Sequence, residues 1–338
     1  MSQAAKHFSR IYVERGANAY PFAQQILQRF PTAQRVDIED YRDVFNRPGQ
    51  DFQRQKQSKA LILARKKQDF LYPANEYVQG RDVANFHYTT LQLNCLYNCA
   101  YCFLQGMYTS ANLVAFVNLE DYFEAAERAL SQRSNPSKPL ELAISYESDL
   151  LASERILPYC REWIEFARQQ PDLVIEMRTK SGNWAALQDL EPHPRAVLAW
   201  TLSPQEIIER YEQDTAPVNQ RLKALSLASQ AGWPVRLCFD PVLPNANWRS
   251  SYRELFTETF ARIPPNNVVD VSLGVFRLNT EYFNRLKKNR PDTDLAYRFY
   301  HRENGVVTHP HNEREMLIDF ARTELTRFIP ADKLQIWT

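Results

Sequence analysis

The chain has 338 residues, of which 44% are hydrophobic and 24% are charged, and its formal net charge is +1. This composition is typical of a folded protein of one large or two modest domains, and it excludes a disordered chain. The charge gives no sign of a nucleic-acid binder, and the sequence has no Walker or G-x-G-x-x-G loop and no apolar run long enough for a membrane span.

The first 85 residues predict a small mixed α/β unit. Pro21 suits the first position of a helix over residues 21–30, and residues 46–49 predict a turn. Short apolar segments predict strands at 10–13, 35–38 and 59–63. We expect residues 1–85 to form an N-terminal α/β extension that packs on the domain that follows.

From residue 86 the predicted strands and helices alternate. The strands are short and apolar, as buried parallel strands are, and they are 86–93, 140–146, 173–179, 196–202, 235–239 and 268–275. The predicted helices are 119–130, 154–169, 184–190, 218–231, 248–262 and 280–288. Six strand–helix units predict a partial (β/α)6 barrel of the TIM type over residues 86–290, with chemistry at the carboxyl ends of the strands.

The remaining residues, 291–338, predict a β-hairpin followed by a helix. The dipeptide Asn304-Gly305 favours a tight turn between two short strands. Residues 312–328 carry apolar side chains at helical spacing and predict an amphipathic helix.

A cysteine triplet of spacing C-x3-C-x2-C, made of Cys95, Cys99 and Cys102, follows the first strand of the alternating region. Three thiolates are one ligand fewer than a closed iron–sulfur or structural zinc site has. The triplet is the signature of radical S-adenosylmethionine (AdoMet) enzymes, in which the fourth iron of a [4Fe-4S] cluster binds AdoMet, and an aromatic residue such as Tyr101 is common there. The alternatives are a zinc site with His87 as fourth ligand, or three plain thiols.

The remaining cysteines and the first ten residues indicate the cell compartment in which the protein is expected. Cys160 falls within a predicted helix and Cys238 within a predicted strand, so both are interpreted as buried core thiols. Clustered rather than paired cysteines indicate a reducing compartment, and the polar first ten residues predict no signal peptide. We therefore expect a cytoplasmic protein.

Polar residues at the predicted strand ends are candidates for the rest of an AdoMet pocket. They are Ser148, Asp149, Lys180, Thr201 and Ser203. A lysine at this edge could neutralise the AdoMet carboxylate or reach a phosphate. The alternative for each residue is an ordinary loop position or a helix cap.

Two segments are locally basic. Residues 54–67 hold six basic residues and no acid, and residues 277–302 hold seven basic and three acidic residues with five interleaved aromatics. A cationic segment rich in aromatic side chains suits phosphates and unstacked bases. The alternative is a solvated charged face.

Nearly the whole chain resembles the spore photoproduct lyase family of radical AdoMet DNA-repair enzymes. The residues that carry the resemblance are the cysteine triplet with Tyr101, Leu104 and Gln105, the pairs Ser148-Asp149 and Thr179-Lys180, and residues 20–21, 47–49, 116–119 and 241–256. The resemblance implies a [4Fe-4S] cluster and AdoMet as cofactors, and an electron donor such as flavodoxin or ferredoxin. It also implies that a 5′-deoxyadenosyl radical takes hydrogen from a methylene-bridged thymine dimer in DNA, whose linkage then fragments.

The resemblance also assigns residues to the two substrates. Ser148, Lys180 and Thr201 would contact AdoMet. A C-terminal β-hairpin would wedge the lesion out of the duplex, as enzymes that act on bases must do, and would place His301 and Arg302 near it.

Two positions depart from the family pattern. The hydrogen-donating cysteine of the family is replaced by Tyr146, and neither Cys160 nor Cys238 is close to it in sequence. The second relay tyrosine is replaced by Phe103, whereas the first survives as Tyr101. Either Tyr146 delivers the hydrogen through its phenol, or the substrate or outcome has changed and Tyr146 only packs.

The sequence therefore predicts a radical AdoMet lyase that cleaves a thymine-dimer-type photolesion in DNA, with Tyr146 in place of the donor cysteine. One alternative is a radical AdoMet enzyme with another nucleic-acid substrate. The other is a non-catalytic iron–sulfur protein that binds DNA.

Overall fold

The computed structural model describes residues 8–74 and 84–337 and separates into two compact units. The first unit is Met1–Leu96 with Tyr108–Arg178, and the second is Tyr97–Met107 with Thr179–Thr338. Among the described residues, no helix has the length and apolar character needed to cross a membrane. The domain boundaries at residues 85 and 290 stay predictions.

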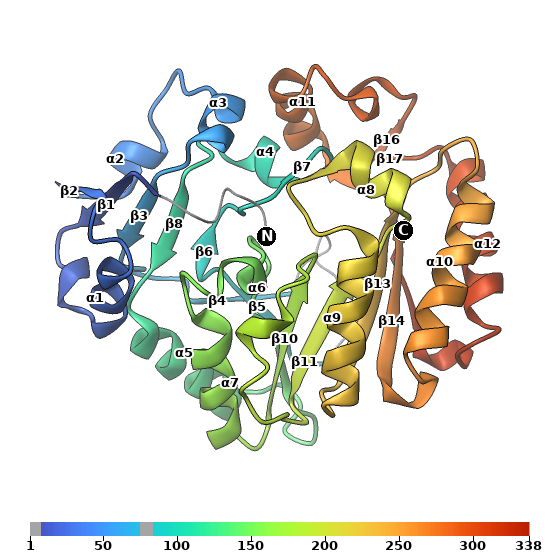
Figure 1. Cartoon of the computed structure of the whole chain (residues 1–338), viewed down its shortest axis with the longest axis horizontal. Helices are drawn as coiled ribbons and strands as arrows, with labels where there is room; N and C mark the ends of the chain where they lie inside the picture. The colour runs from blue at the N-terminus through green and yellow to red at the C-terminus, as the bar shows by residue number, and fades with distance from the viewer. Residues whose placement is uncertain (1–7, 75–83, 338) are drawn as a thin grey trace. The chain divides into compact units, whose positions relative to one another are not determined.

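The first unit contains a five-stranded sheet of order β2-β1-β3-β8-β6 (Figure 1). Its strands are β1 Arg10–Glu14, β2 Gln34–Ile38, β3 Leu61–Ala64, β6 Gln92–Leu93 and β8 Leu113–Phe116. All neighbours pair in parallel except β6 with β8. Every residue of β3 and β8 is buried, as expected of central parallel strands. The helices are α1 Pro21–Gln28, α2 Arg42–Phe45 and α3 Phe52–Gln57.

Four more strands of the first unit have the order β10-β9-β5-β4. They are β4 Leu71–Pro73, β5 Phe86–Thr89, β9 Leu140–Ala143 and β10 Leu173–Thr179, and the helices α5 Leu119–Ser131, α6 Leu150–Ser153 and α7 Tyr159–Gln169 accompany them. The pairs β5/β9 and β9/β10 are parallel, and β4 pairs antiparallel with β5. The prediction of one strand over 86–93 is wrong, because β5 and β6 pair in different sheets. The chain changes sheets at Thr90 and Leu91, where the N–H of Phe116 donates to the carbonyl of Leu91.

The second unit has four parallel strands of order β18-β14-β13-β11. They are β11 Ala196–Thr201, β13 Val235–Val242, β14 Val268–Val275 and β18 Leu334–Trp337, with helices α9 Val218–Gln230, α10 Trp248–Arg262 and α12 His311–Leu325. Helices α10 and α12 lie side by side, and α12 contacts β14 (Figure 1). The predicted helix over 184–190 is only a single 3-10 turn, Trp184–Ala186.

The second unit also holds the cysteine loop and the hairpin. Strand β7 Asn98–Cys99 pairs antiparallel with β12 Glu212–Gln213, which follows α8 Gln205–Tyr211. A three-stranded sheet joins β15 Arg277–Asn279, β17 Val306–Thr308 and β16 His301–Glu303. The hairpin prediction is confirmed, and Asn304 and Gly305 take the positive φ values of 48° and 77° that its tight turn requires.

One hydrophobic core supports both features. It contains Ala100 of the cysteine loop, Val307 of the hairpin, and Phe283 and Leu286 of α11 Thr280–Asn289. Helix α4 Leu104–Met107 packs closely on α11, because Gly106 leaves no room for a Cβ against the backbone of Tyr282. The position of the cysteine loop therefore depends on the elements that carry the hairpin.

Candidate active site

Backbone hydrogen bonds hold the loop that carries Cys99 and Cys102. The N–H of Cys102 donates to the carbonyl of Cys99 at 3.1 Å, which also accepts from the side chain of Gln105 at 2.6 Å. Arg290 Nη1 donates to the carbonyl of Asn98 at 3.1 Å. Cys99 is buried and Cys102 is partly exposed. These bonds to main-chain carbonyls hold the backbone turn that carries both cysteines.

Cys95 belongs to the first unit and is buried. Its carbonyl accepts from the buried ammonium of Lys56 at 2.7 Å. The preceding Asn94 has φ of 66°, and its side-chain amide donates to the carbonyls of Ser110 and Asn112 at 2.7 and 2.9 Å. These contacts stabilise the left-handed backbone that leads into the triplet.

The structure does not test whether the three thiolates converge. Among the described residues, no three His, Cys, Asp or Glu side chains are gathered as ligands of a metal ion would be. Cys95 lies in one unit, and Cys99 and Cys102 lie in the other. The cluster ligands therefore stay a prediction, as does His87 as a fourth ligand. His87 lies on β5, where burial lowers its pKa and Nδ1 has no hydrogen-bond partner within the described ranges.

A buried ion pair lies beside the cysteine loop, and sequence reasoning missed it. The carboxylate of Glu212 accepts from Arg221 Nη2 at 2.5 Å, and both side chains are fully buried. It also accepts from Tyr101 Oη at 2.5 Å and from Ser203 Oγ at 3.0 Å. Arg221 donates further to the carbonyl of Thr201 at 3.0 Å. The pair therefore joins the cysteine loop to the end of β11.

The electrostatics of this region favour charged groups despite their burial. Burial acts against the ionised carboxylate of Glu212, but Arg221 and Lys180 together lower its pKa. Burial also opposes the charge of Lys180, yet the negative charges of Cys99 and Glu212 raise its pKa. Its ammonium lies 5.5 Å from the centroid of the Tyr101 ring. Lys180 is thus a cation held close to the cysteine loop.

The other candidates at strand ends have different surroundings. The Oγ of Ser148 is buried and has no hydrogen-bond partner in the part of the chain that the structure describes. Asp149 caps α6 by accepting from the N–H of Ala152 at 3.0 Å, so the helix-cap alternative holds for it. Thr201 and Ser203 are both buried at the end of β11. A buried hydroxyl without a partner is costly unless a ligand satisfies it, which makes Ser148 a fitting contact for a polar cofactor.

Tyr146 lies just beyond β9 in the first unit. Its ring centroid is 4.3 Å from that of Tyr88, and Tyr88 stacks in turn on Tyr72 at 5.1 Å. Glu147 is buried and accepts from the phenol of Tyr108. Burial raises the pKa of Glu147. Sequence reasoning found Tyr146 through its position and missed the aromatic neighbours that hold it.

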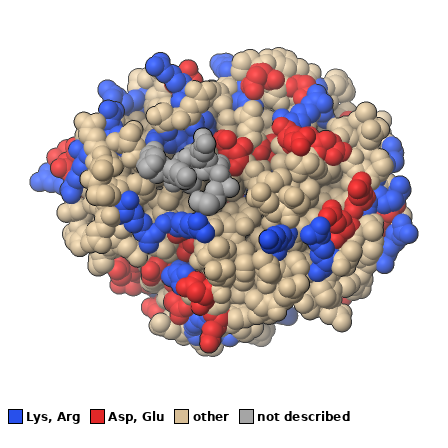
Figure 2. Space-filling view, in the orientation of Figure 1, with Lys and Arg blue, Asp and Glu red and all other residues tan. Residues whose placement is uncertain are grey.

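The hairpin strand β16 is exposed along its whole length. His301 Nε2 is 3.8 Å from the carboxylate of Glu303, and Arg302 Nη2 donates to Asn284 Oδ1 at 3.3 Å. The neighbouring Phe299 is 82% exposed, an unusual state for so large an apolar side chain. Elsewhere, basic and acidic side chains are interspersed on the face viewed in Figure 2. The hairpin region is therefore accessible to a substrate.

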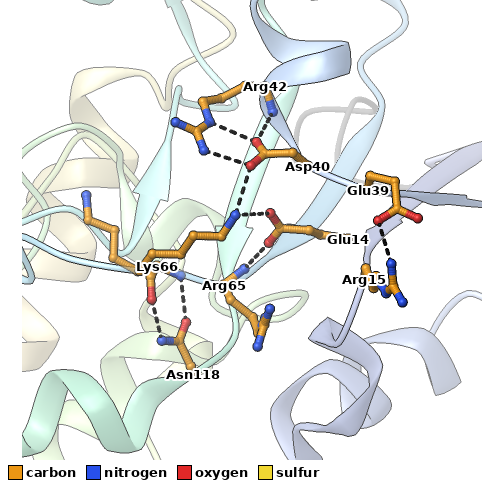
Figure 3. A network of polar contacts seen from close by, with 9 residues as sticks. Glu14, Arg15, Glu39, Asp40, Arg42, Arg65, Lys66 and Asn118 are labelled. Carbon is orange, nitrogen blue, oxygen red and sulfur yellow. Dashed lines mark hydrogen bonds and ion pairs between the residues drawn. The ribbon is translucent and has the colours of Figure 1, made fainter.

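The basic stretch over 54–67 is largely engaged within the first unit. Lys56 and Lys59 are buried, and Lys59 Nζ donates to the carbonyl of Lys56 at 2.7 Å. Lys67 Nζ is 2.9 Å from Asp40, and the N–H of Arg65 donates to Glu14 at 2.7 Å (Figure 3). The ammonium groups of Lys56, Lys59 and Lys67 therefore have partners within the unit, whereas Arg65 engages Glu14 through its backbone.

Comparison with known proteins decides the family. The sequence model described as spore photoproduct lyase matches residues 7–335. The chain belongs to the spore photoproduct lyase family. Spore photoproduct lyase of Bacillus subtilis (strain 168) is 22% identical over 349 residues, which cover 97% of each chain. A solved double mutant of spore photoproduct lyase with bound AdoMet and dinucleoside spore photoproduct has a TM-score of 0.81 at 18% identity over 97% of both chains. A structure of spore photoproduct lyase complexed with dinucleoside spore photoproduct has the same TM-score, identity and coverage.

Membership of the spore photoproduct lyase family confirms several predictions. The family is one of radical AdoMet lyases that use a [4Fe-4S] cluster and AdoMet, so the predicted enzyme class and cofactors are confirmed. The likeness to the solved structures, with the parallel strands of both units, confirms the α/β fold of partial-barrel type. The individual site residues stay predictions.

Proposed function

We propose that this chain is a radical AdoMet lyase that cleaves a thymine-dimer-type photolesion in DNA. The observation that carries the proposal is a family match along nearly the whole chain, combined with the triplet Cys95, Cys99 and Cys102. Relatives of similar fold have been solved with AdoMet and with dinucleoside spore photoproduct. The family membership favours an enzyme over the non-catalytic alternative.

The three cysteines would hold a [4Fe-4S] cluster, and the bound cluster with AdoMet would supply a carbon radical that removes a hydrogen atom from the lesion. Ser148 offers a buried hydroxyl without a partner, and Lys180 offers a cation suited to the AdoMet carboxylate. Thr201 and Ser203 complete the proposed set at the end of β11. Glu212 and Arg221 are positioning residues, because they fix Ser203 and the carbonyl of Thr201.

Tyr146 would return a hydrogen atom to the thymine radical that remains after the linkage breaks. A C–H bond forms on the thymine and the phenolic O–H bond of Tyr146 breaks, which leaves a phenoxyl radical. The alternative Tyr101 is already engaged, because its O–H donates to Glu212. This engagement disfavours Tyr101 as the donor.

The hairpin would contact the lesion-containing DNA. His301 and Arg302 lie on an exposed strand, and the exposed ring of Phe299 precedes them. Aromatic and cationic side chains suit unstacked bases and phosphates. A donor of the flavodoxin or ferredoxin class would supply the reducing electron.

Anaerobic reconstitution tests the proposal. The full chain is loaded with iron and sulfide and given AdoMet, dithionite and a DNA that contains spore photoproduct. We expect 5′-deoxyadenosine and repaired thymines from the wild type. Cys99→Ala should lose bound iron and both products, whereas Cys238→Ala, at a buried cysteine within β13, should keep them. Deoxyadenosine without repair would refute the substrate and leave the enzyme class intact.

A second candidate is a radical AdoMet enzyme with a different nucleic-acid substrate. The substitutions at Tyr146 and Phe103 favour it, because both fall on the hydrogen-return path that the resemblance implies. Tyr146→Phe should abolish repair if the phenol is the donor. Intact repair by that variant would refute the phenol as donor, whereas a gain of turnover in Tyr146→Cys would favour the shared substrate.

A further inference from the structure

Three tyrosine rings form a continuous stack in the first unit. The ring centroids of Tyr88 and Tyr146 are 4.3 Å apart at an interplanar angle of 37°, and those of Tyr72 and Tyr88 are 5.1 Å apart at 20°. Rings at these separations are in direct contact. The stack therefore links the proposed donor, Tyr146, to a second phenol on a neighbouring strand.

Strand pairing holds the stack in place. Tyr72 of β4 lies directly opposite Tyr88 of β5 in an antiparallel pair. Tyr88 in turn pairs with Ala143 of β9 in parallel, and Tyr146 follows that strand by three residues. Opposite side chains on one face of a sheet contact each other, so the register itself brings Tyr72 against Tyr88. The β5/β9 register therefore brings Tyr88 next to the turn that carries Tyr146, and the isolated bridge between Thr90 and Ser145 joins the two segments there.

The two ends of the stack differ in charge. Lys66 Nζ donates to the phenol of Tyr72 at 2.9 Å and lies 5.3 Å from its ring centroid. Asn118 fixes the backbone of Lys66 through its N–H and its carbonyl, both at 2.8 Å (Figure 3). A positive charge beside a ring opposes the loss of an electron from that ring. Tyr72 is therefore a poor site for a radical, and the usable part of the stack ends at Tyr88.

We propose that Tyr88 is a relay residue that restores the hydrogen of Tyr146, an inference that rests on the proposed donation from Tyr146. After that donation the phenoxyl of Tyr146 takes a hydrogen atom from Tyr88. The O–H bond of Tyr146 forms again, the O–H bond of Tyr88 breaks, and the radical moves to Tyr88. One electron from a donor of the flavodoxin or ferredoxin class and one proton from water then restore Tyr88.

The relay accounts for the changed positions along the chain. Phe103 has no hydroxyl, so it cannot exchange hydrogen with Tyr146, and the hydroxyl of Tyr101 is committed to Glu212. Tyr88 is the phenol whose ring the described structure places in contact with both other tyrosines of the stack. A phenol that gives up its hydrogen in each cycle must be restored before the next one, and Tyr88 is the phenol in ring contact with Tyr146.

The experiment compares Tyr88→Phe, Tyr146→Phe and the control Tyr41→Phe in the cluster-loaded full chain with lesion-containing DNA. Tyr88→Phe keeps the ring stack and removes only the hydroxyl. Tyr41 is a partly buried tyrosine of the same unit whose ring packs edge-on against Phe116. Repair is followed as a burst, then as steady-state turnover, and freeze-quenched samples are examined by electron paramagnetic resonance.

We expect Tyr88→Phe to repair about one lesion per loaded enzyme in a normal burst and then to lose about tenfold in steady-state turnover. Its tyrosyl signal should persist longer than in the wild type, because the radical stays on Tyr146. Tyr41→Phe should match the wild type in both phases. Wild-type steady-state turnover in Tyr88→Phe would overturn the relay, and so would loss of its burst, because Tyr88 would then act before hydrogen return. Burst repair by Tyr146→Phe would instead refute the proposed donor.

Discussion

The buried pair of Glu212 and Arg221 gives the sharpest prediction about stability. Both side chains are fully inaccessible, and their charged atoms are 2.5 Å apart. Arg221→Met would leave the carboxylate of Glu212 buried without its main cation, which costs about 3–5 kcal/mol of unfolding free energy. Glu212→Gln together with Arg221→Met should cost less than the sum of the two single changes, because the double variant leaves neither member of the pair charged.

Urea unfolding of the full chain measures these free energies. A control ion pair with the same separation but exposed side chains shows how much of the cost is due to burial. Arg322 Nη2 and Asp319 Oδ1 are also 2.5 Å apart, but their side chains are 53% and 63% exposed. Arg322→Met should cost less than about 1 kcal/mol. If Arg221→Met costs no more than Arg322→Met, or if the two changes at the buried pair add without coupling, the argument from burial fails.

Three further changes test other parts of the structure. Gly106→Ala should destabilise the chain by about 1–3 kcal/mol in urea unfolding, because the new Cβ meets the backbone of Tyr282; an unchanged midpoint would contradict the packing of α4 on α11. Burial raises the pKa of Glu154 to about 7, so its contribution to stability is fully present below pH 4.5 and is lost as the pH rises through 7. In the wild type this carboxyl should lower the unfolding free energy by up to about 3 kcal/mol between pH 5 and 8, and Glu154→Gln should abolish that decrease. An unchanged dependence of the unfolding free energy on pH in the variant would contradict the role of Glu154. Gly305→Ala should cost about 1 kcal/mol at φ of 77° and speed hydrogen exchange in the hairpin; unchanged exchange would argue against the turn.

Elements with a strong local pattern could be predicted from the sequence. Helix α10 runs from Trp248 to Arg262 and strand β10 from Leu173 to Thr179, as the apolar spacing indicates. The hairpin followed from one dipeptide, because only a few residue pairs adopt two consecutive positive φ values. Residues 86–93 have an equally clear strand pattern, yet β5 and β6 pair in different sheets. Sheet membership depends on partners far away in the sequence, so a local pattern cannot reveal it.

The same distinction between local patterns and tertiary contacts applies to the residues of the candidate site. The triplet and Ser148 could be found from spacing and from positions after strands, since these are local features. Glu212 and Arg221 could not, because charged residues near or within a helix are usually solvated and only tertiary packing buries them. Lys56 shows the opposite error. The basic stretch around it suggested a surface cation, but its ammonium is buried and donates to the carbonyl of Cys95. Local charge density describes composition, whereas burial decides what a charge does.

The predicted hydrogen path has two tyrosines, Tyr101 of the family pattern and Tyr146 in place of the donor cysteine, and their contacts differ. Tyr101 donates its only hydroxyl hydrogen to a carboxylate whose pKa is lowered by Arg221 and Lys180. Such a carboxylate stays ionised and keeps accepting, so that hydrogen reaches a carbon radical only if the bond to Glu212 breaks first. The ring of Tyr146 contacts the ring of Tyr88, with centroids 4.3 Å apart. A contact between two rings does not use the hydroxyl hydrogen, so loss of that hydrogen from Tyr146 leaves this contact in place.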